Sequence, residues 1–407
     1  MKGLLFLAAF FVSNSLAGNV ADLNYQINTS TAVLHDIGFN AVKLIVGSGQ
    51  ESSSDSLFFF MDISHDYTII GDSKQVKWGV VCNEQSNSCK VEDQTTQEDF
   101  YNSFQVKYQK ASVFTRVNPN QKLNTEGITK LNIRLMTGGQ KWFLDSYGVV
   151  GLTPQGDFAN YLRGVYDKET SIAIKYKLKT PVNRNDRLVF DGYAVQNPIV
   201  GQTDTLFTTT LSKEEKFWTV KGDLAFPESE YNYKDIKFCL TTISSEIIQV
   251  IDAMVFNRKI QTMACDGKYW NECTKKNADL KKLPPLSITL GAVTFSFTPE
   301  EYTYFDNDGV LTSRIGDIQP MRSDQQCPIE TEFAIGKLFF QKYIPLFTFA
   351  KDGSAKLSFL NKLDVQEGKS NIWLYIALGG AIVAILVILA ILLKWKAPGD
   401  DDYAPAN

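Results

Sequence analysis

Short apolar runs separated by polar turns dominate the chain between residues 19 and 369. The runs are rich in β-branched and aromatic residues, and Gly, Asn, Asp and Ser cluster between them, which is typical of strands joined by turns. Such runs are NAVKLIVGSG, SLFFFMDI, KLNIRLMTGG, SIAIKYKLK, RLVFDGY, LSITLGAVTFSF and AKLSFL. Helical periodicity is limited to Asp157–Tyr166, Glu246–Val255 and one turn after Gly336. We therefore predict an all-β, mostly antiparallel fold with a few short helices.

Two apolar segments at the ends of the chain do not fit this pattern. Residues 1–17 combine Lys2, an apolar stretch and a small-residue site at Ser15-Leu16-Ala17, which predicts a secretory signal peptide cleaved after Ala17. Residues 372–393 carry no charge and are long enough to cross a hydrocarbon core of about 30 Å as a helix. We expect a transmembrane helix there.

The residues that follow this segment set its expected orientation. Lys394 and Lys396 favour the cytosolic side, so residues 394–407 are expected to form a cytosolic tail. A lipid-anchor signal is the competing interpretation of a C-terminal apolar segment, but such signals end in the apolar stretch and this one continues into a charged tail. The prediction is a single-pass type I membrane protein of the secretory pathway, at the cell surface or on an internal membrane.

Translocation would place the six cysteines in an oxidising compartment, where disulfides form. Cys82 and Cys89 are close enough for a local bridge, and Cys239, inside an apolar stretch, could be a buried free thiol. Asn28 begins the sequence Asn-Thr-Ser, a glycosylation acceptor. We therefore expect a disulfide-bonded glycoprotein whose remaining pairings the sequence leaves open.

Charge and histidine content narrow the function classes. The net charge of the 407 residues is −4, which gives no reason to expect nucleic-acid binding. His35 and His65 are the two histidines, so little room is left for metal or Ser-His chemistry. We predict no metal and no cofactor.

A weak internal repeat places one acidic residue in an unusual position. In the first half an apolar run ends at Asp62-Ile63-Ser64, and YGVVGL follows at residues 147–152. In the second half KFCLTTISS (residues 237–245) is followed by FAIGKLFF at residues 333–340. Each half thus combines an apolar run and a turn with a later apolar-apolar-Gly element. An aspartate at such a turn is most often a turn or cap residue.

The order of these segments resembles the pepsin-like aspartic proteases over roughly residues 42–360. The resemblance rests on segments that match in order: VKLIVGSGQ, FFFMDISHDYTII, CNEQSNSC, FQVKYQKASV, YGVVGLTP, LPPLSITLGAVTFSF and FAIGKLFFQKYIPLFTFAKDGSAKLSF. It implies a bilobal acid-protease fold, with lobes at residues 18–185 and 186–369 and a peptide-binding cleft between them. It also implies that Cys265 is bridged to Cys327, leaving Cys239 and Cys273 unassigned.

The resemblance also implies positions for the site residues. Asp62 takes the place of the first catalytic aspartate, and Tyr108 that of the flap tyrosine. Ser64, Thr241 and Thr242 would line the cleft. The second D-T-G aligns on Leu240-Thr241-Thr242, so a leucine replaces the second aspartate.

The family mechanism needs both carboxylates, which share one proton and act as acid and base. The sequence therefore favours a membrane-anchored pseudoprotease that binds a peptide or protein in its cleft. The alternative is an active aspartic endopeptidase, working at acidic pH, in which Asp62 has a non-standard partner. Asp235, five residues before Leu240, and Asp252, beyond the turn, are two acidic residues near it in sequence.

Overall fold

The computed structural model describes residues 40–46, 55–72, 89–101, 104–116, 130–139, 148–165, 169–178, 188, 190–198, 200–201, 203–226, 232–242, 244–318 and 332–363. All of these belong to one compact unit, Ala21–Asp364. The predicted signal peptide, transmembrane segment and tail lie outside the described residues, as do Asn28, Cys82 and Cys327. In the described ranges, no helix is long and apolar enough to cross a membrane.

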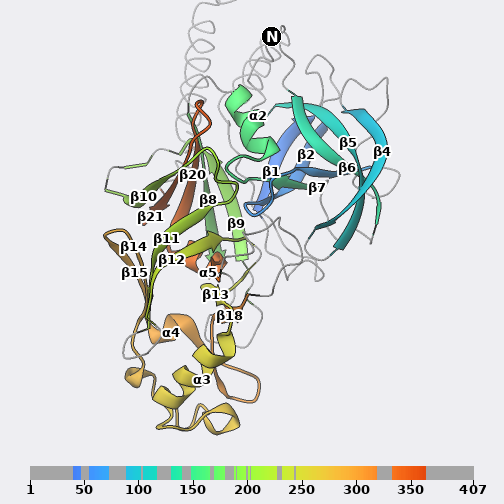
Figure 1. Ribbon diagram of the computed structural model, residues 1–407. Coiled ribbons are helices and arrows are strands. Elements are labelled where there is room, and N and C mark those ends of the chain that lie inside the picture. The colour runs from blue at the N-terminus through green and yellow to red at the C-terminus, as the bar shows by residue number, and fades with distance from the viewer. Residues whose placement is uncertain are drawn as a thin grey trace, which may run out of the picture. The chain divides into compact units, whose positions relative to one another are not determined.

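Strands dominate these ranges, as the apolar runs predict (Figure 1). The first sheet has the order β1-β2-β7-β3-β6-β5-β4. Its strands are β1 Asn40–Val46, β2 Asp55–Asp62, β3 Ile69–Gly71, β4 Cys89–Tyr101, β5 Phe104–Arg116, β6 Lys130–Gly139 and β7 Gly148–Gly151. Most pairs in it are antiparallel, but β2 runs parallel to β7 and β3 parallel to β6.

Three further sheets complete the β structure of the described ranges. A five-stranded sheet has the order β10-β21-β20-β8-β9, and a seven-stranded sheet has the order β15-β14-β11-β12-β19-β13-β18. Their strands are β8 Thr170–Leu178, β9 Phe190–Gln196, β10 Thr205–Leu211, β11 Thr219–Ala225, β12 Asn232–Leu240, β13 Ile248–Val250, β14 Leu286–Leu290, β15 Val293–Phe297, β18 Ile315–Asp317, β19 Phe333–Ile335, β20 Ile344–Phe349 and β21 Ala355–Leu360. A two-stranded sheet pairs β16 Thr303–Phe305 with β17 Leu311–Ser313.

The described helices are short. They are α2 Asp157–Val165, α3 Ala253–Ala264, α4 Pro299–Tyr302 and α5 Lys337–Lys342, with 3-10 turns η1 Trp270–Glu272 and η2 Leu280–Lys282. The helices predicted after Asp157 and after Gly336 are confirmed as α2 and α5. The helix predicted over Glu246–Val255 is wrong. Its first part is strand β13, which pairs with both β18 and β19, and helix α3 begins only after the cap residue Asp252.

Buried side chains tie the first half of the chain to the second. The indole Nε1 of Trp218 donates to the carbonyl of Leu152 at 2.6 Å, and its ring packs against Phe347. Arg163 of α2 donates to the carbonyls of Pro154 and Ala350, the second of which lies in the β20–β21 hairpin. These contacts hold α2 against the five-stranded sheet, whose strands come from residues 170–211 and 344–360.

Candidate functional site

Asp62 is the last residue of β2, where an apolar strand passes into a tight loop. The main chain of Asp62 lies opposite Gly151 in the parallel pairing of β2 with β7. A Cβ atom on Gly151 would lie 2.5 Å from the carbonyl oxygens of His65 and Tyr67, so only glycine fits beneath this loop. The apolar-apolar-Gly element thus holds the loop that carries Asp62.

The carboxylate of Asp62 is fully buried and accepts hydrogen bonds on both oxygens. Oδ1 accepts from the main-chain N–H of Ser64 at 2.8 Å and from the hydroxyl of Thr242 at 3.2 Å. Oδ2 lies 2.9 Å from Nδ1 of His65, whose side chain is also buried. Since an ionised carboxylate only accepts, Nδ1 carries the proton in this contact.

Two opposing effects set the protonation of Asp62. Burial raises the pKa of its carboxyl group, while the electrostatic interaction with His65 and the hydrogen bonds from His65 and Ser64 lower it. The balance leaves the pKa of Asp62 below its ordinary value. Asp62 is therefore held as an anion beside a histidine.

The second half repeats this construction. Strand β12 runs parallel to β19, with Leu240 opposite Ile335. One step further along the same register, Thr241 lies opposite Gly336. A Cβ on Gly336 would lie 2.4 Å from the carbonyl oxygen of Glu246 and 2.9 Å from the hydroxyl of Ser244. Both predicted repeat pairs are thus parallel strand pairs that end at a glycine under a tight loop.

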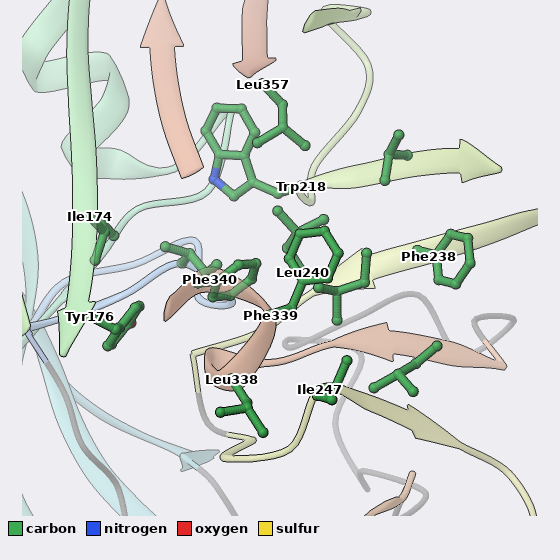
Figure 2. Close-up of a cluster of buried hydrophobic side chains, with 14 of the residues drawn as sticks. Ile174, Tyr176, Trp218, Phe238, Leu240, Ile247, Leu338, Phe339, Phe340 and Leu357 are labelled. Atoms are coloured by element: carbon green, nitrogen blue, oxygen red, sulfur yellow. The ribbon is translucent and has the colours of Figure 1, made fainter. Parts of the chain in front are cut away.

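This register moves the counterpart of Asp62 from Leu240 to Thr241. His65 and Tyr67, whose carbonyl oxygens lie over Gly151, are three and five positions after Asp62. Ser244 and Glu246, which lie over Gly336, are three and five positions after Thr241. Leu240 is instead the counterpart of Met61, and both side chains belong to the buried hydrophobic core. Figure 2 shows Leu240 in an apolar cluster with Trp218 and Phe339. The alignment that put Leu240 at the second catalytic position is one residue out of register.

Neither Asp235 nor Asp252 replaces the missing aspartate. The carboxylate of Asp235 is exposed on β12, 3.9 Å from Lys221. Asp252 caps α3, where its Oδ1 accepts from the N–H of Val255 at 3.3 Å. Each therefore has a local role away from Asp62.

The two loops are joined by the hydroxyl groups predicted to line a cleft. Ser64 Oγ donates to Thr241 Oγ1 at 3.3 Å, and the Thr242 hydroxyl reaches Asp62 as described. Ser64, Thr241 and Thr242 are all buried. The structure thus brings four predicted site residues together, but they bond to one another across the two halves.

Tyr108, the fifth predicted site residue, has a different environment. It is buried on β5, and its hydroxyl donates to Oε1 of Gln97 on β4 at 2.9 Å. The guanidinium carbon of Arg134 lies 4.6 Å from the centre of the Tyr108 ring and 3.3 Å from that of Tyr67. The ring of Tyr67 in turn meets His65 edge to face, with ring centres 5.6 Å apart. A chain of ring contacts therefore connects Tyr108 to the partner of Asp62.

Sequence reasoning missed His65, Tyr67 and Arg134. His65 could have been predicted from the sequence, because a histidine three residues after an aspartate in a loop can form a hydrogen bond with its carboxylate. Arg134 lies on β6 and is 67 positions from Tyr67, so no local pattern connects them.

The disulfides correct two expectations. Cys265 is bonded to Cys273, so the bridge from Cys265 to Cys327 implied by the resemblance is wrong. Cys89 and Cys239 are also disulfide-bonded, which removes the interpretation of Cys239 as a free thiol. Their partners lie outside the described residues. In the part of the chain that is described, no three His, Cys, Asp or Glu side chains gather in a group able to hold a metal ion.

Comparisons with known proteins give a limited match. No protein-family model matches the chain. A segment of 110 residues is 29% identical to cathepsin E-B of Xenopus laevis, which covers 26% of this chain and 23% of that protein. The chain therefore spans about a quarter of the length of the curated relative it matches. This weak similarity hints at the pepsin-like aspartic proteases.

Proposed function

We propose that this protein is a membrane-anchored, pepsin-like pseudoprotease whose two-lobed ectodomain binds a peptide or protein without cleaving it. The observation that carries the proposal is how the Asp62 carboxylate is hydrogen-bonded and which residue is its counterpart in the second half. Its two oxygens accept hydrogen bonds from Ser64, His65 and Thr242, and its register counterpart is the hydroxyl residue Thr241.

The chemistry of an aspartic protease explains why this arrangement favours binding over catalysis. Two carboxylates a few ångströms apart cannot both ionise, so they share a proton and can act as acid and base in turn. Here the proton next to Asp62 is on the imidazole of His65, and the interaction with this ring favours the anion. An anion satisfied by donors of its own chain has no proton to give to a leaving group.

The ligand class and the location follow from other features. The resemblance is to a family whose cleft binds extended peptides by strand-like pairing. The predicted signal peptide and transmembrane segment support an ectodomain on the non-cytosolic side. The disulfide between Cys265 and Cys273 supports an oxidising compartment.

The test is cleavage of a denatured protein substrate by the purified full-length chain in detergent, from about pH 3 to about pH 6, the range in which aspartic dyads work. Asp62→Asn is the matched variant, because asparagine keeps an acceptor oxygen for Ser64 and Thr242. We expect no cleavage above background for either protein, while an active aspartic protease added to the same mixture cleaves. Acid-dependent cleavage by the wild type that Asp62→Asn abolishes would show the alternative, an aspartic endopeptidase with a non-standard partner for Asp62.

A further inference from the structure

The large apolar side chains that are exposed in the described ranges gather on one structural unit. They are Ile251, Met254, Tyr269 and Trp270, with exposed fractions of 61, 58, 38 and 54%. Ile251 lies two residues before α3 and Met254 is the second residue of this helix, while Tyr269 and Trp270 lie in the loop that follows it (Figure 1). Clustered exposed apolar side chains mark interaction sites, whereas scattered ones need no explanation.

Arg258 connects the two pairs into one feature. Met254 and Arg258 are four positions apart in α3, so they lie on the same side of the helix, and Ile251 lies two residues before its first turn. The guanidinium carbon of Arg258 lies 4.4 Å from the centre of the Tyr269 ring. We call the five residues Ile251, Met254, Arg258, Tyr269 and Trp270 the α3 ridge.

The loop half of the ridge is held in one conformation. The disulfide between Cys265 and Cys273 closes it. Trp270 has a φ of +52°, in the left-handed region that a bulky residue rarely adopts, at a cost of about 1–2 kcal/mol. The buried Gln261 maintains this backbone, because its Oε1 accepts from the N–H of Trp270 at 2.9 Å and its Nε2 donates to the carbonyl of Leu311 at 2.6 Å. A strained, preorganised tryptophan facing solvent is typical of a binding anchor.

The surroundings of the ridge are basic although the chain as a whole is acidic. Residues 251–282 contain seven Lys and Arg against four Asp and Glu, a net charge of +3 in a chain of net charge −4. Lys282 pairs with Asp266 at 2.7 Å. The side chains of Lys268, Lys275, Lys276 and Lys281 are exposed, and none of them pairs with a carboxylate of the described residues. The charge of this surface is therefore complementary to an acidic partner.

We propose that the α3 ridge is a docking surface for an acidic protein segment that carries apolar anchors. Tyr and Trp are the residue types that dominate binding energy at protein interfaces, and the surrounding lysines would steer an acidic segment to them. A bilayer fits less well. Helices that bind membranes insert a broad apolar face, whereas that of α3, formed by Ala253, Phe256, Ile260 and Ala264, is already buried in the core. The docking surface is independent of the chemistry at Asp62.

The experiment measures binding of the full-length chain in detergent to a random copolymer of glutamate and tyrosine, with a lysine–tyrosine copolymer as the opposite-charge control. Two variants remove the proposed contacts: Trp270→Asn, because asparagine tolerates a positive φ, and Lys275→Glu combined with Lys276→Glu. The matched control combines Lys177→Glu with Lys213→Glu, two exposed lysines outside the ridge that change the net charge equally.

We expect the acidic copolymer to bind, with a dissociation constant that rises about tenfold in Trp270→Asn and in the Lys275→Glu and Lys276→Glu double variant, and less than about twofold in the control. Binding should weaken as salt rises from about 50 to about 300 mM. Three results would overturn the proposal: equal affinity in ridge and control variants, ridge-dependent binding of anionic phosphatidylserine vesicles in place of the copolymer, or ridge-dependent self-association of the chain in sedimentation.

Discussion

The imidazole Nδ1 of His65 lies 2.9 Å from Oδ2 of Asp62, and neither side chain is exposed. A buried anion without a partner is very unfavourable, and a histidine three residues further along the same loop donates a hydrogen bond to this one. The pair therefore does locally what the shared proton of two carboxylates does in an aspartic protease. It keeps a carboxylate buried where the two halves of the chain meet.

Replacing His65 by alanine should destabilise the fold strongly. The change leaves the buried Asp62 carboxylate without the hydrogen bond from Nδ1 of His65, and leaving a buried charged acceptor unsatisfied in this way costs about 3 kcal/mol. His65→Asn should lose less, because its amide can still donate one hydrogen bond to Oδ2. Denaturant unfolding of the full-length variants measures the free energy of unfolding that each substitution removes. Equal stabilities for wild type and His65→Ala would mean that the pair contributes nothing to the fold.

Asp62 itself is expected to stabilise the protein. Asp62→Ala leaves the Ser64 N–H, the Thr242 hydroxyl and His65 without their acceptor, which should cost about 3 kcal/mol. A carboxylate kept only for catalysis behaves in the opposite way, because its removal commonly leaves stability unchanged or raises it. Thermal unfolding of wild type and Asp62→Ala at neutral pH distinguishes a stabilising Asp62 from one kept only for catalysis.

The stability difference between wild type and Asp62→Ala should also depend on pH, in a direction that the pKa of Asp62 determines. The folded pKa of Asp62 lies below its unfolded value of about 3.9, so its stabilising contribution is complete above about pH 4–5 and is lost as the pH falls through the folded pKa. The stability difference between wild type and Asp62→Ala should therefore be constant from about pH 5 to about pH 7 and shrink below about pH 4. A difference that instead grows in acid would contradict an ionised Asp62.

Asp157, the first residue of α2, should show the reverse pH dependence. Burial and the nearby charge of Asp66 raise its pKa from 3.8 to about 6, although Arg134 opposes the shift. The folded state thus holds the proton more tightly than the unfolded chain, so stability falls as the pH rises from about 4 to about 6. Asp157→Asn should raise the free energy of unfolding by about 1 kcal/mol at pH 7 and by nothing near pH 4. Glu169→Gln, on an exposed residue paired with Lys356, serves as the control.

Local patterns in the sequence were sufficient for much of the fold. The apolar runs before Asp62 and Thr241 become β2 and β12, and each apolar-apolar-Gly element becomes the strand that runs parallel to them. Residues 246–255 show the limit of such patterns. Their helical periodicity is overridden by the pairing of β13 with two other strands, and Asp252 was the signal that the helix starts later.

The site was harder to predict because it depends on contacts between distant segments. Aligning the second half by residue type put Leu240 opposite Asp62, since a slip of one residue leaves the motif almost unchanged. In a strand the same slip moves a side chain to the other face of the sheet. The pairing of Cys265 with Cys273 depended in the same way on folded geometry, because six cysteines allow many connectivities.

The register can be tested by introducing an aspartate at each of the two adjacent positions. Leu240→Asp puts a charge into the apolar cluster around Trp218, where the side chain is 1% exposed, and should cost more than about 4 kcal/mol or prevent folding. Thr241→Asp puts the carboxylate among the hydroxyl groups that join the two loops, next to Ser64. There it should be tolerated better, and its repulsion of Asp62 should raise the pKa of one of the two carboxyl groups.

NMR titration of the carboxyl carbons in folded Thr241→Asp would reveal two coupled titrations. A stable Leu240→Asp whose carboxyl is coupled to Asp62 would restore the alignment made from sequence, because only a side chain directed toward Asp62 can feel its charge.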